Sequence, residues 1–207
     1  MSISDLLVER VGSCRRDGLA WDVVEDGRRE QAFSSAAGIF SSDCEKLIDS
    51  NSMKLLACYS AYRSLLAWFN YCSDSRPLRL VEYGIECVLN ERNPIFDAGA
   101  FTPIAPLDGS GKIVDCRMTD TLSSSTSIAY ACRYLASSDI FDFIVSISYA
   151  HVAFEVSPIH RSEVFEAWLC KIALPAAHQH RKMQFDEKFA MSDFSFDDSG
   201  RIFDRAL

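Results

Sequence analysis

The sequence predicts a mainly α, single-domain protein: a bundle-like array of about five to seven helices over residues 1–207, with a small β-hairpin near its N-terminus. Three observations support this prediction. The chain has 207 residues, a length that suits one domain with its own core. Hydrophobic residues make up 48% and charged residues 24%, which are ordinary globular proportions. From residue 43 onward, apolar residues recur largely at helical spacing.

The first forty residues predict two small elements. A short amphipathic helix ends at Gly12. Asp26-Gly27 then forms a two-residue hairpin turn, because both positions tolerate positive φ. The arms of this hairpin are residues 19–25 and 28–33, and the second arm begins with a strongly polar stretch.

Residues 43–73 predict a long helix that begins with Ser42 as its N-cap and Glu45 at the capping-box position. Its buried stripe repeats every seven residues, at Ile48, Leu55, Tyr62 and Phe69. Three cysteines share the partner positions of this stripe: Cys44, Cys58 and Cys72. Successive cysteines lie about 21 Å apart along a helix, which is too far to share one metal ion.

Two further helices are predicted at residues 77–91 and 121–135. Pro77 suits the first turn of the earlier helix, and Pro94 prevents its continuation. Between the two helices, residues 94–114 are rich in proline and glycine. They predict either an ordered surface loop or a hinge between two halves of the chain.

Residues 139–157 allow two structures, because their apolar residues alternate but change parity near His151. A strand would need a bulge there, whereas a buried helix that follows Ser138 and stops before Pro158 needs none. The helix is therefore favoured. Another helix is expected to begin at His160 or Ser162 and to end near Pro175, and a polar helix to follow at residues 176–190.

Charge and cysteine content exclude several classes of protein. The formal net charge of −8 argues against a general nucleic-acid binder, which needs surplus cations to displace phosphate counterions. Asp5 and Glu9 stand where a secretory leader would have a positive start, and no apolar stretch reaches the ~20 residues of a membrane-spanning helix. The eight cysteines form no CxxC pair, so we expect reduced core thiols. These features predict a cytoplasmic protein without metal or cofactor that binds neither membranes nor nucleic acid.

Motif searches find no complete catalytic set. Residues 108–112, with the sequence DGSGK, lack the first glycine and the last hydroxyl residue of a phosphate-binding loop, so we interpret them as a turn. His151 and Glu155 would pair on one face of a helix, either as a candidate site or as a satisfied core pair. His160 and Glu163 would lie in the first turn of a helix, as an acid–base cluster or as a solvated helix end.

His178 and His180 form an HxH pair, which binds one metal ion when the chain is extended. On a helix the two side chains would diverge by about 200°. Arg181 and Lys182 follow and would repel a cation. We therefore favour a solvated helix end over a metal site.

The tail at residues 184–207 is acidic and rich in phenylalanine. It holds five of the 14 Phe residues and a net charge of −3. Exposed aromatic rings would anchor a partner, and the carboxylates would steer a basic partner toward them. The candidate protein-binding residues are Asp193, Phe194, Phe196, Asp197 and Asp198. The alternation in Phe194-Ser195-Phe196 would equally suit an edge strand docked on the chain itself.

Together the observations favour a binding protein over an enzyme. A small, acidic, helical protein without catalytic motifs has the profile of immunity proteins, which neutralise bacterial toxins by occluding a basic active site. The first alternative is another helical adaptor, a secretion chaperone or a defence accessory protein. The second is an enzyme whose site comprises His151, Glu155, His160 and Glu163.

Overall fold

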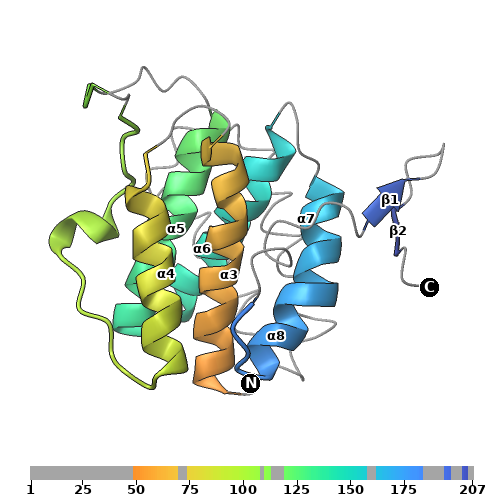
Figure 1. The fold of residues 1–207 in the computed structure, drawn as a ribbon, viewed down its shortest axis with the longest axis horizontal. Helices are drawn as coiled ribbons and strands as arrows, with labels where there is room; N and C mark the ends of the chain where they lie inside the picture. The colour runs from red at the N-terminus through yellow and green to blue at the C-terminus, as the bar shows by residue number, and fades with distance from the viewer. Residues whose placement is uncertain are drawn as a thin grey trace.

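The computed structural model describes residues 49–69, 74–107, 110–112, 119–157 and 162–183, together with two short strands. Its elements in chain order are α3 (Ser50–Phe69), α4 (Arg76–Leu89), the 3-10 helix η2 (Ala98–Phe101), α5 (Thr119–Ser137), α6 (Ile140–Glu155), α7 (Ser162–Trp168), the π-helical turn η3 (Leu169–Ala173), α8 (Leu174–His178), β1 (Phe194–Phe196) and β2 (Ile202–Asp204). The predicted mainly α class is confirmed (Figure 1). The predicted N-terminal helix and hairpin lie outside the described residues.

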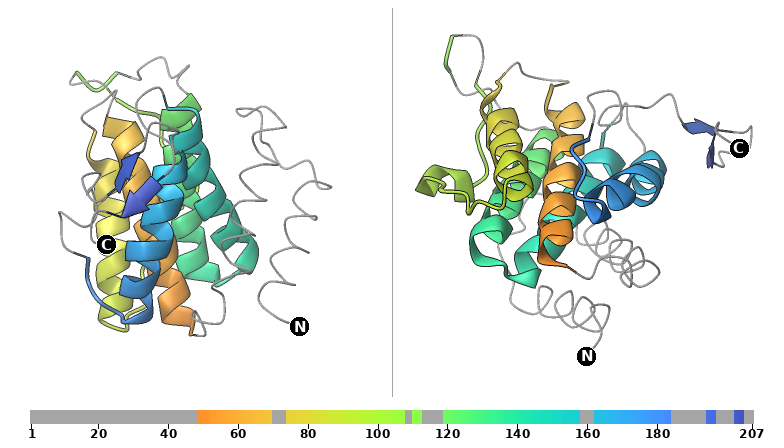
Figure 2. Two further views of the ribbon diagram at one scale, coloured as in Figure 1. Left: turned by 90° about the vertical axis from the view of Figure 1, so that its right-hand side faces the viewer. Right: turned by 60° about the horizontal axis from the view of Figure 1, so that its bottom comes forward.

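Helix α3 runs through the middle of the helical body, where α4, α5, α6 and α8 contact it (Figure 1). The right-hand view of Figure 2 shows α3 between α4 on one side and α7 and α8 on the other. Its side chains are buried on nearly every face. Small hydroxyl residues allow a neighbouring helix to come close: the Ser64 hydroxyl lies 3.0 Å from that of Ser124 on α5. The buried Ser60 hydroxyl donates within α3, to the Leu56 carbonyl.

Helices α5 and α6 form a helical hairpin joined by residues 138–139. The helical alternative for residues 139–157 is thereby confirmed. Its first residue was predicted one position too early, because Asp139 rather than Ser138 caps α6 and accepts a hydrogen bond from the Phe141 N–H. Across the hairpin, the Ser146 hydroxyl donates to the carbonyl of Ser127 at 2.9 Å.

Helix α4 confirms the helix predicted at residues 77–91, with Pro77 in its first turn. Gly84 allows α4 to pack closely on the rest of the body. A Cβ atom at this position would lie 2.7 Å from Cδ1 of Leu135 on α5 and 3.4 Å from Sγ of Cys58 on α3. The loop after α4 is attached to α5, because the Ser125 hydroxyl donates to the Ile104 carbonyl. These contacts favour the surface-loop alternative over a hinge.

The predicted start of the long helix at residue 43 is wrong. Helix α3 begins at Ser50, and Asp49 lies outside it. The Asp49 carboxylate accepts a hydrogen bond from the Ser52 N–H at 2.8 Å, so Asp49 acts as the N-cap. The expected capping residues Ser42 and Glu45 lie outside the described residues.

The predicted helix end near Pro175 and the predicted helix at residues 176–190 are also wrong. Pro175 lies inside a continuous helical segment, directly after the π-helical turn η3. Proline removes an N–H and crowds the carbonyl four residues earlier, and the wider π turn accommodates both effects. The helical segment then ends at His178, and His180 takes a positive φ of 49°. Residues 184–190 lie outside the described part of the chain.

Strands β1 and β2 pair in an antiparallel ribbon near the C-terminus. The register places Phe194 opposite Asp204, Ser195 opposite Phe203 and Phe196 opposite Ile202. The ribbon lies beyond α7 at one side of the helical body, and β2 approaches α7 (Figure 1). Residues 194–196 therefore form a strand, which the sequence offered as the alternative to an exposed docking segment. The strand pairs with β2 of the same tail and not with the helical body.

Among the described residues, no helix is both long and apolar enough to cross a membrane. Among the described cysteines, Cys58, Cys87 and Cys132 are buried and Cys170 is half-buried, and none of the four forms a disulfide. The burial of Cys58, Cys87 and Cys132 agrees with the expectation of core cysteines, whereas Cys170 is only partly in the core.

Candidate functional site

The candidate binding residues of the tail fall partly within strand β1. Phe194 and Phe196 are its first and last residues. Asp193 precedes the strand and lies outside the described residues, as do Asp197 and Asp198, which follow it. The acidic positions therefore flank a strand whose own residues pair with β2.

The His151 side chain joins α6 to α7. Its Nε2 atom lies 2.7 Å from a carboxylate oxygen of Glu166, and its Nδ1 atom lies 3.9 Å from a carboxylate oxygen of Glu155. The His151 side chain is only 2% exposed, and its ring packs edge-on against Phe165. One ring nitrogen thus contacts Glu166, and the other, which faces Glu155, is buried without a hydrogen-bond partner among the described residues.

The four-residue enzyme site suggested by the sequence is not brought together in the described residues. His151 and Glu155 are neighbours, at the i, i+4 spacing that the sequence indicated. His160 lies outside the described residues, and only the backbone of Glu163 is described. The closer partner of His151 is Glu166, which no local spacing could identify because it lies on the next helix.

Arg63 is a fully buried charge on α3 that the sequence did not mark as functional. Its guanidinium carbon lies 5.2 Å from the ring centre of Trp168 and 5.8 Å from that of Phe154. These cation–π contacts join three helices, α3, α6 and α7. The arginine therefore acts as part of the core where these helices meet.

Asp49, Ser52 and His180 form a second polar cluster, which links the start of α3 to the end of α8. Nε2 of His180 lies 2.9 Å from Oδ1 of Asp49 and 3.2 Å from the Ser52 hydroxyl, which donates to the other Asp49 oxygen. Burial alone would raise the pKa of Asp49, but the hydrogen bonds from Ser52 and the contact with His180 outweigh it and lower the pKa to about 2.

This Asp–His–Ser cluster does not have the geometry of a nucleophilic triad. In a triad the histidine contacts the serine and the aspartate through different ring nitrogens. Here Nε2 of His180 contacts both, and the fully buried Ser52 hydroxyl already donates to Asp49. The cluster instead links the start of α3 to the residues that follow α8. It also engages His180, whereas His178, the other histidine of the HxH pair, is the exposed last residue of α8.

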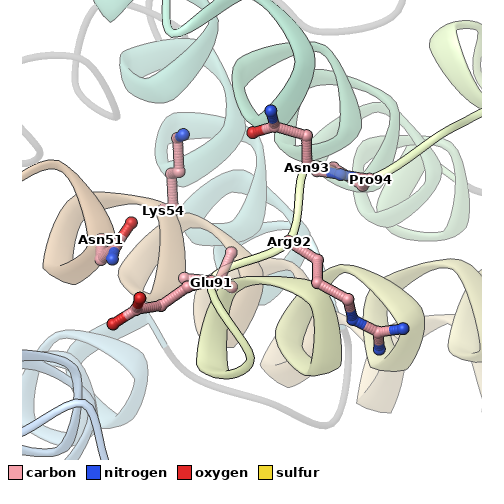
Figure 3. A pocket seen from close by; sticks show the side chains of 7 residues that line it. Asn51, Lys54, Glu91, Arg92, Asn93 and Pro94 are labelled. Carbon is pink, nitrogen blue, oxygen red and sulfur yellow. The ribbon is translucent and has the colours of Figure 1, made fainter.

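The described residues contain no group of three His, Cys, Asp or Glu side chains that could hold a metal ion. Charged side chains do gather at three surface pockets. The first, of about 190 Å³, is lined by Asn51, Lys54, Val88, Glu91, Arg92, Asn93 and Pro94. In Figure 3, Lys54 and Asn93 point to one side, Glu91 points to the other, and Arg92 points away from all three. These side chains therefore do not converge on one point of the pocket.

The second pocket, of about 340 Å³, lies at the corner between α5 and α6. The carboxylate of Asp142 accepts a hydrogen bond from Ser137 and lies 3.1 Å from Nη2 of Arg133. Burial raises the pKa of Asp142, and the attraction of Arg133 only partly offsets this effect. The charges of this pocket are therefore engaged with each other.

The third pocket, of about 420 Å³, lies between α4 and the loop that carries η2. It combines arginine side chains with apolar walls.

No family model matches the chain, and neither a curated protein nor a solved structure matches it.

Proposed function

We propose that this chain is a protein-binding protein that acts as an immunity protein. Its acidic, Phe-rich tail would dock on a basic surface of a bacterial toxin and occlude the toxin's active site. The observation that most supports this proposal is the pairing of β1 with β2, which joins two segments of the tail in an antiparallel ribbon.

The ribbon is so small that contact with a partner protein would stabilise it. Each strand has three residues, and an isolated two-stranded hairpin is marginally stable in water. A ribbon edge can also pair with a strand of a partner protein, which supplies main-chain hydrogen bonds in addition to side-chain contacts. Contact with a partner would therefore stabilise the ribbon and contribute to affinity at the same time.

Charge makes a basic partner the best complement. The tail carries −3 of the chain's net −8, and Asp193, Asp197 and Asp198 flank β1 directly. Such charges speed association with a basic surface, and the effect weakens as salt shortens the Debye length, to about 8 Å at 0.15 M. The helical body would serve as a scaffold, held together by polar ties such as His151–Glu166.

An immunity gene is expected to lie beside the gene of its toxin, so the test identifies the neighbouring gene product and asks whether this chain protects cells that produce it. Full-length protein should protect them and should bind the purified toxin. A triple variant, Asp193→Asn with Asp197→Asn and Asp198→Asn, should lose protection and bind at least about tenfold more weakly at low salt, because several steering charges are removed. A matched control replaces three exposed acids of α4 and its C-terminal end: Glu82→Gln, Glu86→Gln and Glu91→Gln.

The control should behave as the unmodified protein does. Equal binding by the tail variant and the control would contradict the role of the tail. Binding to a neighbouring gene product without protection would contradict the immunity function and favour the adaptor or chaperone alternative. The absence of any toxin against which the protein protects would likewise refute the immunity function.

A further inference from the structure

The pocket between α4 and the η2 loop has the size of a ligand site. Its volume of about 420 Å³ falls within the ~300–1,000 Å³ range of small-molecule pockets. Figure 1 shows this loop standing off the outer side of α4. The lining residues are Arg76, Arg79, Leu80, Tyr83, Asp97, Gly99, Ala100 and Ile104. The four from α4 share one helix face, because their spacing is i, i+3, i+4 and i+7.

Arg79 is the open cation of this pocket. Its side chain is exposed, and it has no ion-pair or hydrogen-bond partner among the described residues. Arg76 differs, because its guanidinium pairs with Asp74 at 2.6 Å and donates to the Ala105 carbonyl at 2.9 Å. A guanidinium without a partner beside a pocket is suited to bind a carboxylate through two parallel hydrogen bonds.

Tyr83 supplies a second donor one helical turn from Arg79. Its hydroxyl oxygen accepts a hydrogen bond from the Ile95 N–H at 3.1 Å, and its ring packs edge-on against Phe96 at 5.7 Å. These two contacts fix the position of the hydroxyl group. Its own hydrogen has no acceptor in the described part of the chain, so it remains available to a ligand.

The rest of the lining is apolar apart from one acid. Leu80, Ala100 and Ile104 provide the apolar wall. Asp97 is the acid of this lining, and its carboxylate caps η2 by accepting a hydrogen bond from the Ala100 N–H at 3.1 Å. Arg79 is therefore the cation of this lining that has no partner among the described residues, and it can take one ligand carboxylate, which would have to bind away from the Asp97 carboxylate.

We propose that this pocket binds a monocarboxylate with an apolar body. The carboxylate would accept hydrogen bonds from Arg79 and from the Tyr83 hydroxyl, and the apolar body would lie against Leu80 and Ile104. This site goes beyond the proposed function, because it lies on α4 and includes no residue of the tail. A free carboxylic acid and the C-terminal carboxylate of a peptide share this chemistry.

The experiment titrates the isotope-labelled full chain with three probes and follows its NMR amide signals. The probes are 4-methylpentanoate, a free acid; N-acetyl-L-leucine, which mimics a peptide C-terminus; and N-acetyl-L-leucinamide, which lacks the charge. We expect saturable shifts at residues 97–104 with at least one acid, and at least about tenfold weaker binding of the amide, because a charge-assisted hydrogen bond is lost. The tighter of the two acids identifies the source of the ligand.

Two variants test the residues that carry the site. Arg79→Gln should weaken binding of the acids at least about tenfold, and Tyr83→Phe should weaken it less, since it removes an uncharged donor. The matched control is Arg92→Gln, the same change at an exposed arginine outside this pocket, and it should bind as the unmodified chain does. The proposal is overturned if neither acid gives saturable shifts, if the amide binds as tightly as the acids, or if folded Arg79→Gln binds them normally.

Discussion

Nε2 of His151 lies 2.7 Å from a carboxylate oxygen of Glu166, although 15 residues separate the two in the chain. The contact joins the buried face of α6 to α7. Because His151 is 2% exposed, its ring nitrogens have little access to water and depend on protein partners. The pair therefore fixes α7 against the body more specifically than apolar packing alone would.

Replacing Glu166 with alanine should lower the free energy of unfolding by about 1–2 kcal/mol, because a buried histidine nitrogen loses its partner. Glu166→Gln should cost less, since its amide can still form a hydrogen bond. Urea denaturation of both variants measures the difference, and Glu86→Ala on the exposed face of α4 serves as the control. A loss no larger for Glu166→Ala than for the control would show that the contact contributes nothing to stability.

Gly84→Ala should destabilise the protein by about 1 kcal/mol or more, even though alanine is the better helix former by ~0.8 kcal/mol. The added Cβ would lie 2.7 Å from Cδ1 of Leu135 and would force this buried side chain to move. Shortening that side chain with Leu135→Val should recover part of the loss in the double variant. Thermal melting of the two single variants and the double variant gives the coupling. Simple additivity would contradict the proposed clash.

The free energy of unfolding should fall as the pH drops from about 4 to about 2, because the Asp49 carboxylate becomes protonated in this range. Its folded-state pKa of about 2 lies below the ordinary value of 3.8, so the folded state favours the charged form. This contribution is complete above pH 4 and is lost as the carboxylate becomes protonated. Because the side chain is nearly half exposed, we expect an effect of only about 0.5 kcal/mol. Denaturant midpoints at each pH should converge with those of Asp49→Asn toward pH 2.

Thiol reagents should modify Cys170 well before Cys58, Cys87 or Cys132 in the folded protein. Burial raises the pKa of Cys58 well above its usual range, and that of Cys132 to about 12, so neither forms the reactive thiolate at neutral pH. Cys170 is only half-buried. Mass spectrometry of peptides after timed alkylation measures the order. Modification of Cys58 as fast as Cys170 without unfolding would contradict it.

The sequence predicted secondary structure and burial best where these depend on the periodicity of a single helix. The inward positions of the helix at 121–135, such as Ile128 and Leu135, are buried as the helical spacing predicted. The helix at 139–157 was favoured over a strand because a strand required a bulge, and α6 is indeed a helix. These successes depend on local periodicity, which one helix imposes on its own residues.

Features that depend on contacts between distant segments could not be predicted in the same way. The start of α3 is fixed by Asp49, whose carboxylate contacts Ser52 and also His180, which follows α8 and lies 131 positions later in the chain. Likewise, Pro175 stays within a helical segment because a π turn precedes it. The pocket around Arg79 and Tyr83 needs the η2 loop to fold back on α4, which no spacing within α4 reveals.

The helical hairpin of α5 and α6 also bears on the order of folding. Its partners are separated by a connection of two residues, so their contacts close short loops at little cost in chain entropy. By contrast, the Asp49–His180 contact closes a loop of 131 residues. We expect the hairpin to form in the folding nucleus and the end of α8 to dock later. Substitutions within the hairpin should then slow folding, whereas loss of the Asp49–His180 contact should mainly accelerate unfolding.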